Sequence, residues 1–314
     1  MARRQIPDEG WEIDRLLPDQ VDIETVEAFH LGGDRFSASF ELSNDRSEFA
    51  RSFLLDVRYG GTLTFDIRLR IEDSILSHVS LSQDRHLVLE LGGIIHHLQP
   101  EGDTEVTMKP SRLRRIWALD AGHQFLIGDR GISFLREGGD WQAIEPYGDS
   151  LFKSVHGLTP QTIHACGTRG ELVRLEGRRW VPLEVPVQTE FKAVHLGEDG
   201  SLYLAGTDGQ CLAIRDSELI PIANEGWTYI GIAEFKGERY WSDANFGLSI
   251  QRGDRLEPFR ALGQGFAMHA SPDLLVIAGW KEVFIFDGQE WRGFEMGYDG
   301  NIFLSALDMT QFGG

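Results

Sequence analysis

The sequence has few of the residues that cross-link secreted proteins or carry a chain through a membrane. Cysteine occurs only at Cys166 and Cys211, which is too few for a disulfide framework, so we expect reduced thiols and a cytoplasmic chain. No run of about 18 apolar residues is present, and the first residues lack the apolar core of a secretion signal. We therefore expect no membrane association.

The common catalytic and cofactor motifs are also missing. The sequence contains no Cys-x-x-Cys, His-Glu-x-x-His or Asp-x-Asp-x-Asp-Gly, which are typical of zinc and calcium sites. It contains no Gly-x-Ser-x-Gly nucleophile turn and no phosphate-binding glycine loop. We therefore predict no metal and no cofactor.

Basic residues are outnumbered, with 30 Lys and Arg against 49 Asp and Glu, which gives a net charge of -19. Such a charge repels phosphate-rich partners, so we expect neither nucleic-acid nor anionic-membrane binding. It accelerates encounter with a basic protein. The alternative, that the charge serves solubility alone, stays open.

Glycine is abundant, with 36 residues against 11 prolines, and it marks a repeat. Three similar segments, Phe125–Gly131, Ile163–Gly170 and Leu202–Gly209, place their first turn glycines at Gly128, Gly167 and Gly206, at two intervals of 39 residues. The next position in this register is Asn245, where asparagine is the residue that best replaces glycine in a left-handed turn. We expect left-handed turns along this column.

A tryptophan column follows the same register. Trp141 and Trp180 each lie thirteen residues after a turn glycine, and Trp291 lies twelve after Gly279. Each begins an alternating segment, and their fixed repeat position predicts a role in packing between repeats. Within one repeat, residues 191–222 read as four short strands separated by Gly- and Asp-rich turns.

Four-stranded units repeated at a fixed interval are typical of a β-propeller. The turn glycines, the apolar third strand and the later tryptophan resemble bacterial β-propeller repeats of a loose Gly-x-x-Gly…Gly-x-x-Trp kind, over roughly residues 75–300. The segments lack the Gly-His and Trp-Asp pairs of WD40 repeats and the paired glycines of kelch repeats. The resemblance implies a fold and no particular activity.

We predict an all-β chain in which residues 1–314 form a single propeller domain of seven blades with four antiparallel strands each. Six repeats begin near residues 75, 113, 152, 191, 230 and 266, and residues 1–74 form an irregular first blade. The alternative is a six-bladed propeller with a separate N-terminal β segment. Trp11–Leu17, as a fourth strand, and Asn301–Leu307, as a first strand, are candidates to close the ring, and the tail extends to residue 314.

The register also gathers polar residues on the predicted innermost strands. Eleven residues before each turn position stand Trp117, His156, His195, Glu234 and Met268, the last beside His269. Imidazoles and a carboxylate on neighbouring strands can act as acid and base or ligate a metal. The simpler interpretation is that they pack between blades or bind channel water. His156, His195 and Glu234 are the candidate catalytic residues.

Acidic residues recur at the predicted turns, where recognition surfaces usually lie. The candidate binding residues are Glu198, Asp199, Asp208, Asp243, Asp287 and Asp299. The one compact basic cluster contains Arg112, Arg114 and Arg115 with Lys109 nearby, and we expect it to be a solvated face of a connection between blades.

Two functions follow from these observations. The first is a non-enzymatic protein-binding propeller, monomeric by itself, whose acidic rims hold a basic protein partner. A bacterial immunity or antitoxin-type protein that sequesters a basic effector would have these properties. The alternative is a propeller hydrolase or lyase that uses the channel arc of His156, His195 and Glu234.

Overall fold

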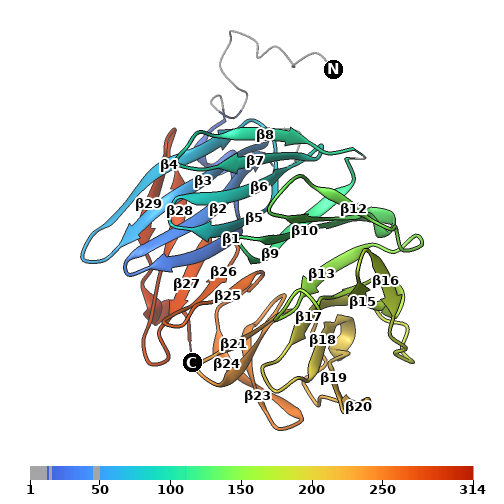
Figure 1. Cartoon of the computed structure of the whole chain (residues 1–314). Helices are drawn as coiled ribbons and strands as arrows, with labels where there is room; N and C mark the ends of the chain where they lie inside the picture. The colour runs from blue at the N-terminus through green and yellow to red at the C-terminus, as the bar shows by residue number, and fades with distance from the viewer. Residues whose placement is uncertain (1–12, 14–15, 45–49, 110, 314) are drawn as a thin grey trace.

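The computed structural model describes residues 13, 16–44, 50–109 and 111–313 of the 314-residue chain. Its strands form seven antiparallel sheets arranged as the blades of one propeller (Figure 1). The predicted all-β fold with seven blades is confirmed, and the six-bladed alternative is wrong because residues 21–71 form a complete four-stranded blade. No helix in the described part of the chain is long and apolar enough to cross a membrane.

The strands of each blade follow one another from the innermost to the outermost position. The first blade contains β1 (Val21–Gly32), β2 (Arg35–Asn44), β3 (Ala50–Tyr59) and β4 (Leu63–Ile71). The second contains β5 (Ile75–Ser82), β6 (Arg85–Glu90), β7 (Ile94–Leu98) and β8 (Thr104–Thr107). The third contains β9 (Leu113–Asp120), β10 (His123–Gly128), β11 (Ser133–Glu137) and β12 (Gln142–Ile144). The fourth contains β13 (Phe152–His156), β14 (His164–Gly167), β15 (Leu172–Glu176) and β16 (Arg179–Pro182).

The remaining blades keep this order, and short 3-10 turns join some of the strands. The fifth blade contains β17 (Phe191–Leu196), β18 (Leu202–Gly206), β19 (Leu212–Arg215) and β20 (Glu218–Pro221). The sixth contains β21 (Tyr229–Phe235), β22 (Glu238–Asp243), β23 (Gly247–Arg252) and β24 (Arg255–Ala261). The seventh contains β25 (Met268–Ala270), β26 (Leu275–Ala278), β27 (Glu282–Phe286), β28 (Trp291–Tyr298) and β29 (Ile302–Ala306). The 3-10 turns are η2 (Pro18–Gln20), η3 (Asp129–Gly131), η4 (Thr168–Gly170), η5 (Thr207–Gly209) and η6 (Met309–Gln311).

Antiparallel order places alternate turns at opposite ends of a sheet. We call the end with the turns between second and third strands, and with the connections between blades, the upper face. The turns between first and second, and between third and fourth strands, form the lower face. Backbone hydrogen bonds repeat on the upper face, where Asp129 N donates to Arg112 O at 2.9 Å and Thr168 N to Leu151 O at 3.2 Å.

This close approach explains the glycine register. A Cβ atom at Gly128 would lie 2.0 Å from the carbonyl oxygen of Arg112, and one at Gly167 would lie 2.4 Å from that of Leu151. The φ angles of these two glycines are -167° and -165°, which is extended backbone, and Asn245 also lacks a positive φ. The expectation of left-handed turns along this column is therefore wrong, because steric space, not backbone handedness, selects the glycine.

The left-handed residues lie two and three positions later in each turn. Arg130, Arg169 and Asp208 have φ angles of 56°, 64° and 53°. The next residue of each turn is again a glycine with positive φ. The tryptophan column packs between blades as predicted: Trp180 is buried, and its Nε1 donates to Ser133 Oγ at 2.8 Å in the preceding blade.

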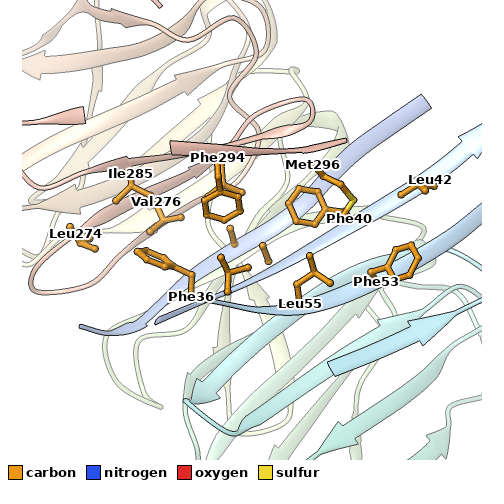
Figure 2. Packing of buried hydrophobic residues seen from close by; sticks show 14 of the residues in the cluster. Phe36, Phe40, Leu42, Phe53, Leu55, Leu274, Val276, Ile285, Phe294 and Met296 are labelled. Atoms are coloured by element: carbon orange, nitrogen blue, oxygen red, sulfur yellow. The ribbon is translucent and has the colours of Figure 1, made fainter. Parts of the chain in front are cut away.

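The first and last blades meet through an apolar core (Figure 2). Phe36, Phe40 and Leu55 of the first blade face Val276 and Phe294 of the seventh, and all five are buried. The backbone contributes as well, because Thr25 N donates to Trp280 O at 2.5 Å. We call this interface the seam, since here the two ends of the blade series are joined.

The strand from Asn301–Leu307 does not supply the first strand of a blade, so that expectation is wrong. Residues 302–306 form β29, which pairs with β28 as a fifth, outermost strand and lies beside β4 of the first blade (Figure 1). Most of Trp11–Leu17, including Trp11, lies outside the described residues. Ile13 is described and is buried in the seam core.

Candidate functional site

The central channel holds the predicted arc. His156, His195 and Glu234 lie on β13, β17 and β21, which are the inner strands of three consecutive blades. The two imidazole rings stack with their centroids 4.3 Å apart. His195 Nε2 lies 3.7 Å from Glu234 Oε2. The structure thus brings the three candidate catalytic residues together near the lower face.

Neighbouring groups already occupy most of the polar atoms of this arc. The Leu196 amide donates to His156 Nδ1 at 3.0 Å, and the Glu198 amide donates to Glu234 Oε2 at 3.0 Å. Arg239 pairs with the other oxygen of Glu234. His195 Nε2 is a buried atom without a hydrogen bond.

The charge states follow from these surroundings. Burial, together with the smaller effect of the adjacent His195 ring, lowers the pKa of His156 to about 3. Burial opposes ionisation of Glu234, but His195, the Glu198 amide and Arg239 outweigh it and lower the pKa to about 2. At neutral pH His156 is therefore neutral and Glu234 ionised, so neither has the pKa near 7 that suits a general acid or base.

The other members of the register lie around the same channel. The Trp117 ring is 5.8 Å from the His156 ring, and His269 stacks on Phe29 of the first blade at 3.7 Å. Burial lowers the pKa of His269 to about 3. These residues and Met268 line a cavity of about 360 Å³. Within the described residues, no group of three His, Cys, Asp or Glu side chains is placed to hold a metal ion.

The six candidate acidic residues are divided between the two faces. Glu198, Asp199 and Asp287 lie in lower-face turns, and Asp208 and Asp299 lie in upper-face turns. Asp243 is completely buried at the end of β22, where its Oδ1 accepts the Asn245 and Phe246 amides at 2.7 and 2.8 Å. Its carboxylate shapes a turn and presents no surface to a partner.

Aspartates occur on the lower face in most of the blades. They lie at five turns between first and second strands and at five between third and fourth strands. These residues are Asp34, Asp84, Asp120, Asp199, Asp273, Asp103, Asp140, Asp216, Asp254 and Asp287. Several cap the turn in which they lie, as Asp287 does by accepting the Gln289 and Glu290 amides at 2.7 and 2.8 Å. Five pair with an Arg or His side chain, and within the described residues the other five do not.

Lys109, Arg112 and Arg114 of the predicted basic cluster lie at the upper face, but Arg115 lines the channel cavity and pairs with the buried Glu27, so the prediction of a solvated position is wrong for Arg115. The cluster at the upper face also includes residues that were not predicted. Arg114 makes a bidentate pair with Asp129, with both contacts at 2.9 Å. These hydrogen bonds lower the pKa of Asp129, and the charges of Arg112 and Lys153 add to the effect, so the fourth blade contributes to the same cluster. Lys153 and Lys192 were not predicted from the sequence to belong to this cluster. They stand fourteen residues before Gly167 and Gly206, as Arg114 stands before Gly128, so a search of the other register positions would have found them.

Comparison with known proteins supports the fold. No family model matches the chain, and no curated protein matches it. Among solved structures, "YCF48 bound to D1 peptide" is similar with a TM-score of 0.63 and 16% identity, over 86% of this chain and 92% of that one. The WD40 propeller domain of Doa1 has a TM-score of 0.71 and 8% identity over 86% and 94%. The computationally designed Ika8 protein has a TM-score of 0.59 and 9% identity over 91% and 97%. At these identities the likeness shows the β-propeller fold alone.

Proposed function

We propose that this chain is a non-enzymatic protein-binding propeller that holds a basic protein partner on its lower face. The observation that carries the proposal is the set of ten lower-face aspartates on a chain of net charge -19. Asp34, Asp140 and Asp273 are exposed and lack an ion-pair partner among the described residues. Unpaired carboxylates on rigid turns attract cationic side chains and accelerate encounter with them.

Two further observations support a binding role. The solved structure of similar fold named YCF48 is bound to a peptide, which illustrates the use of such a scaffold for protein recognition. The channel arc of this chain is locked by the Leu196 and Glu198 amides and by Arg239. That locking favours binding over the hydrolase or lyase alternative. An immunity or antitoxin-type role, in which the propeller sequesters a basic effector, is the setting that we propose.

The test is affinity capture from the source cells with a lower-face variant and a matched control. The lower-face variant combines Asp34→Asn, Asp140→Asn and Asp273→Asn. The control removes three exposed carboxylates elsewhere, through Asp22→Asn, Asp149→Asn and Glu225→Gln. We expect the wild type and the control to capture a basic protein in a salt-sensitive manner, and the lower-face variant to lose about ten-fold in affinity.

An acidic captured partner, or equal losses in the two variants, contradicts the lower-face proposal. The channel arc is tested separately with His195→Ala. Unchanged capture by that variant agrees with the binding role. Turnover of a sugar, lactone or ester substrate that is lost in His195→Ala, with the fold retained, would establish the enzyme alternative.

A further inference from the structure

Each inner strand of the first six blades contains an extra residue, which lies in the middle of β1 and near the upper end of the other five strands. In the third, fourth and fifth blades the strand pairing shifts between the residues on either side of Arg114, Lys153 and Lys192. This is a β-bulge, which re-aims a side chain and often lies beside a functional site. In the first, second and sixth blades the same position holds Val26, Leu76 and Ile230. We call these six residues the bulge ring.

The cations of the bulge ring occupy three consecutive blades. Lys153 Nζ lies 2.9 Å from Glu190 Oε1, and Lys192 Nζ lies 2.8 Å from Glu190 Oε2. Two ammonium groups therefore share one carboxylate at the upper face, and each is more than a quarter exposed. Within the described residues, neighbouring Arg112 and Arg130 have no ion-pair partner. At Glu190, two cationic side chains are thus balanced by one carboxylate, on a molecule that is strongly acidic overall.

Aromatic side chains continue the upper face where the cations end. In the sixth blade Phe246 is 52% exposed, and its ring lies 4.6 Å from that of Trp227. In the seventh blade Trp280 is 46% exposed, and its ring lies 6.1 Å from that of Phe266, which lines the channel cavity. These two exposed aromatic side chains on adjacent blades offer apolar contact area at the upper face.

We propose that the upper face binds an extended polypeptide segment that carries carboxylate side chains beside large apolar ones. The segment would lie from the third to the seventh blade, with its carboxylates on Lys153 and Lys192 and its apolar side chains on Phe246 and Trp280. We expect the ligand to contain carboxylates at the two lysines, because Lys153 and Lys192 share a single carboxylate of the chain itself and can bind another. The aromatic part distinguishes a peptide from a simple anion. This surface lies opposite the proposed lower-face site, so the two proposals are independent.

Substitution of Glu190 tests the proposal, because the direction of the change in peptide affinity depends on what Glu190 does. Its carboxylate competes with the ligand for the same two ammonium groups, so Glu190→Gln should bind an acidic segment more tightly than the wild type. A purely structural role for Glu190 would give unchanged or weaker binding. Substitution of Lys153 and Lys192 should instead weaken binding, because it removes the charges that hold the ligand.

The experiment is fluorescence anisotropy with the full chain and a short labelled peptide of alternating glutamate and phenylalanine. We expect Lys153→Gln with Lys192→Gln to weaken binding about ten-fold or more, and Trp280→Ala to weaken it several-fold. The matched controls are Arg58→Gln, an exposed cation near the lower end of β3, and Phe303→Ala, a 43% exposed aromatic on β29. Both controls should bind like the wild type.

Three results would overturn the proposal. The first is equal binding of a peptide in which glutamine replaces glutamate, because charge would then play no part. The second is equal binding of a peptide in which serine replaces phenylalanine, together with displacement by inorganic phosphate, because the site would then be a simple anion site. The third is equal loss of affinity in the upper-face variants and in their controls.

Discussion

At the scale of single residues, Gly128 shows how a repeat position is fixed by the space around it. The carbonyl oxygen of Arg112 occupies the place of a side chain, since the inner strand approaches the turn closely at this point. The same requirement recurs at Gly167, 39 residues later. The spacing visible in the sequence therefore records a contact between backbone segments, repeated once in each of these blades.

We expect Gly128→Ala to destabilise the protein by about 2–3 kcal/mol, because an added Cβ would overlap the Arg112 carbonyl oxygen and displace the inner strand. Gly139 is the matched control, since a Cβ there meets no atom within 4 Å and its φ is not positive. Gly139→Ala should leave stability nearly unchanged. Urea unfolding followed by tryptophan fluorescence measures both variants. Equal midpoints for the two would contradict the steric explanation.

Glu27 is a buried residue of β1 whose titration affects folding. Burial raises the pKa of this carboxyl to about 7, although Arg115, the His78 amide and Ser77 oppose the shift. The folded chain therefore keeps a proton on Glu27 at pH values where the unfolded chain has lost it. Stability from this group is complete below the unfolded pKa of about 4.5 and is lost as the pH rises toward 7.

Glu27→Gln removes this titration. Relative to the variant, the wild type should lose about 3 kcal/mol of unfolding free energy between pH 4.5 and pH 8. Buried histidines such as His156 and His269, with lowered pKa values, act in the opposite direction, but they are common to both proteins. The difference between the two urea-unfolding profiles isolates Glu27. Parallel profiles would show that the carboxyl titrates normally.

At the scale of elements, the strands of the regular blades could be predicted from the sequence, but the pairing of the last strand and the environment of some turn residues could not. Alternating segments and the 39-residue register suffice to predict strands such as β17 and β18, because each has its own turn signals. The pairing of β29 could not be predicted in the same way, since the apolar alternation of Ile302–Ala306 suits an inner or an outer strand equally. The burial of Asp243 was also missed, because a turn aspartate looks the same whether it caps the turn or faces solvent.

The bulges are invisible to a repeat search for a related reason. An extra residue present at the same place in successive blades leaves their spacing unchanged. The candidate arc of His156, His195 and Glu234 was reached from the sequence because the inner strands share one register. Its locked hydrogen bonding was not, because the Leu196 and Glu198 amides that bind the arc leave no side-chain signal.

We expect β29 to protect the outer edge of the seventh blade. A chain ending after Gly300 would expose the edge of β28, and free strand edges promote association between molecules. A chain ending after Leu307 keeps β29 and the hydrogen bond that the Leu307 amide donates to Gly293 O at 2.9 Å, so it is the matched control. Light scattering at several concentrations should detect association only for the shorter chain. The same behaviour in both chains would assign the effect to the residues after Leu307.

At the scale of the whole molecule, the two faces differ in chemistry on one rigid body. Aspartates lie in the lower-face turns, while the cations at the strand bulges and the exposed aromatics lie at the upper face, and the same blades hold both sets. Each surface can therefore be altered without changing the strand pairing that supports the other. Net charge, which describes the whole chain, conceals this division, and only the placement of the turns makes it apparent.

The seam has a consequence for how the molecule would respond to mechanical load. β1 is the innermost strand of the first blade and β29 is the outermost strand of the last, so both described ends of the sheet series adjoin the same interface. A pulling force applied through these strands would peel β29 from β28 one hydrogen bond at a time, the weak direction of a β-sheet. It would then separate the seam core that contains Phe36 and Phe294, where the two blades share no strand within the described residues. The ring would open at that one joint, and the five blades between would stay stacked as an open arc.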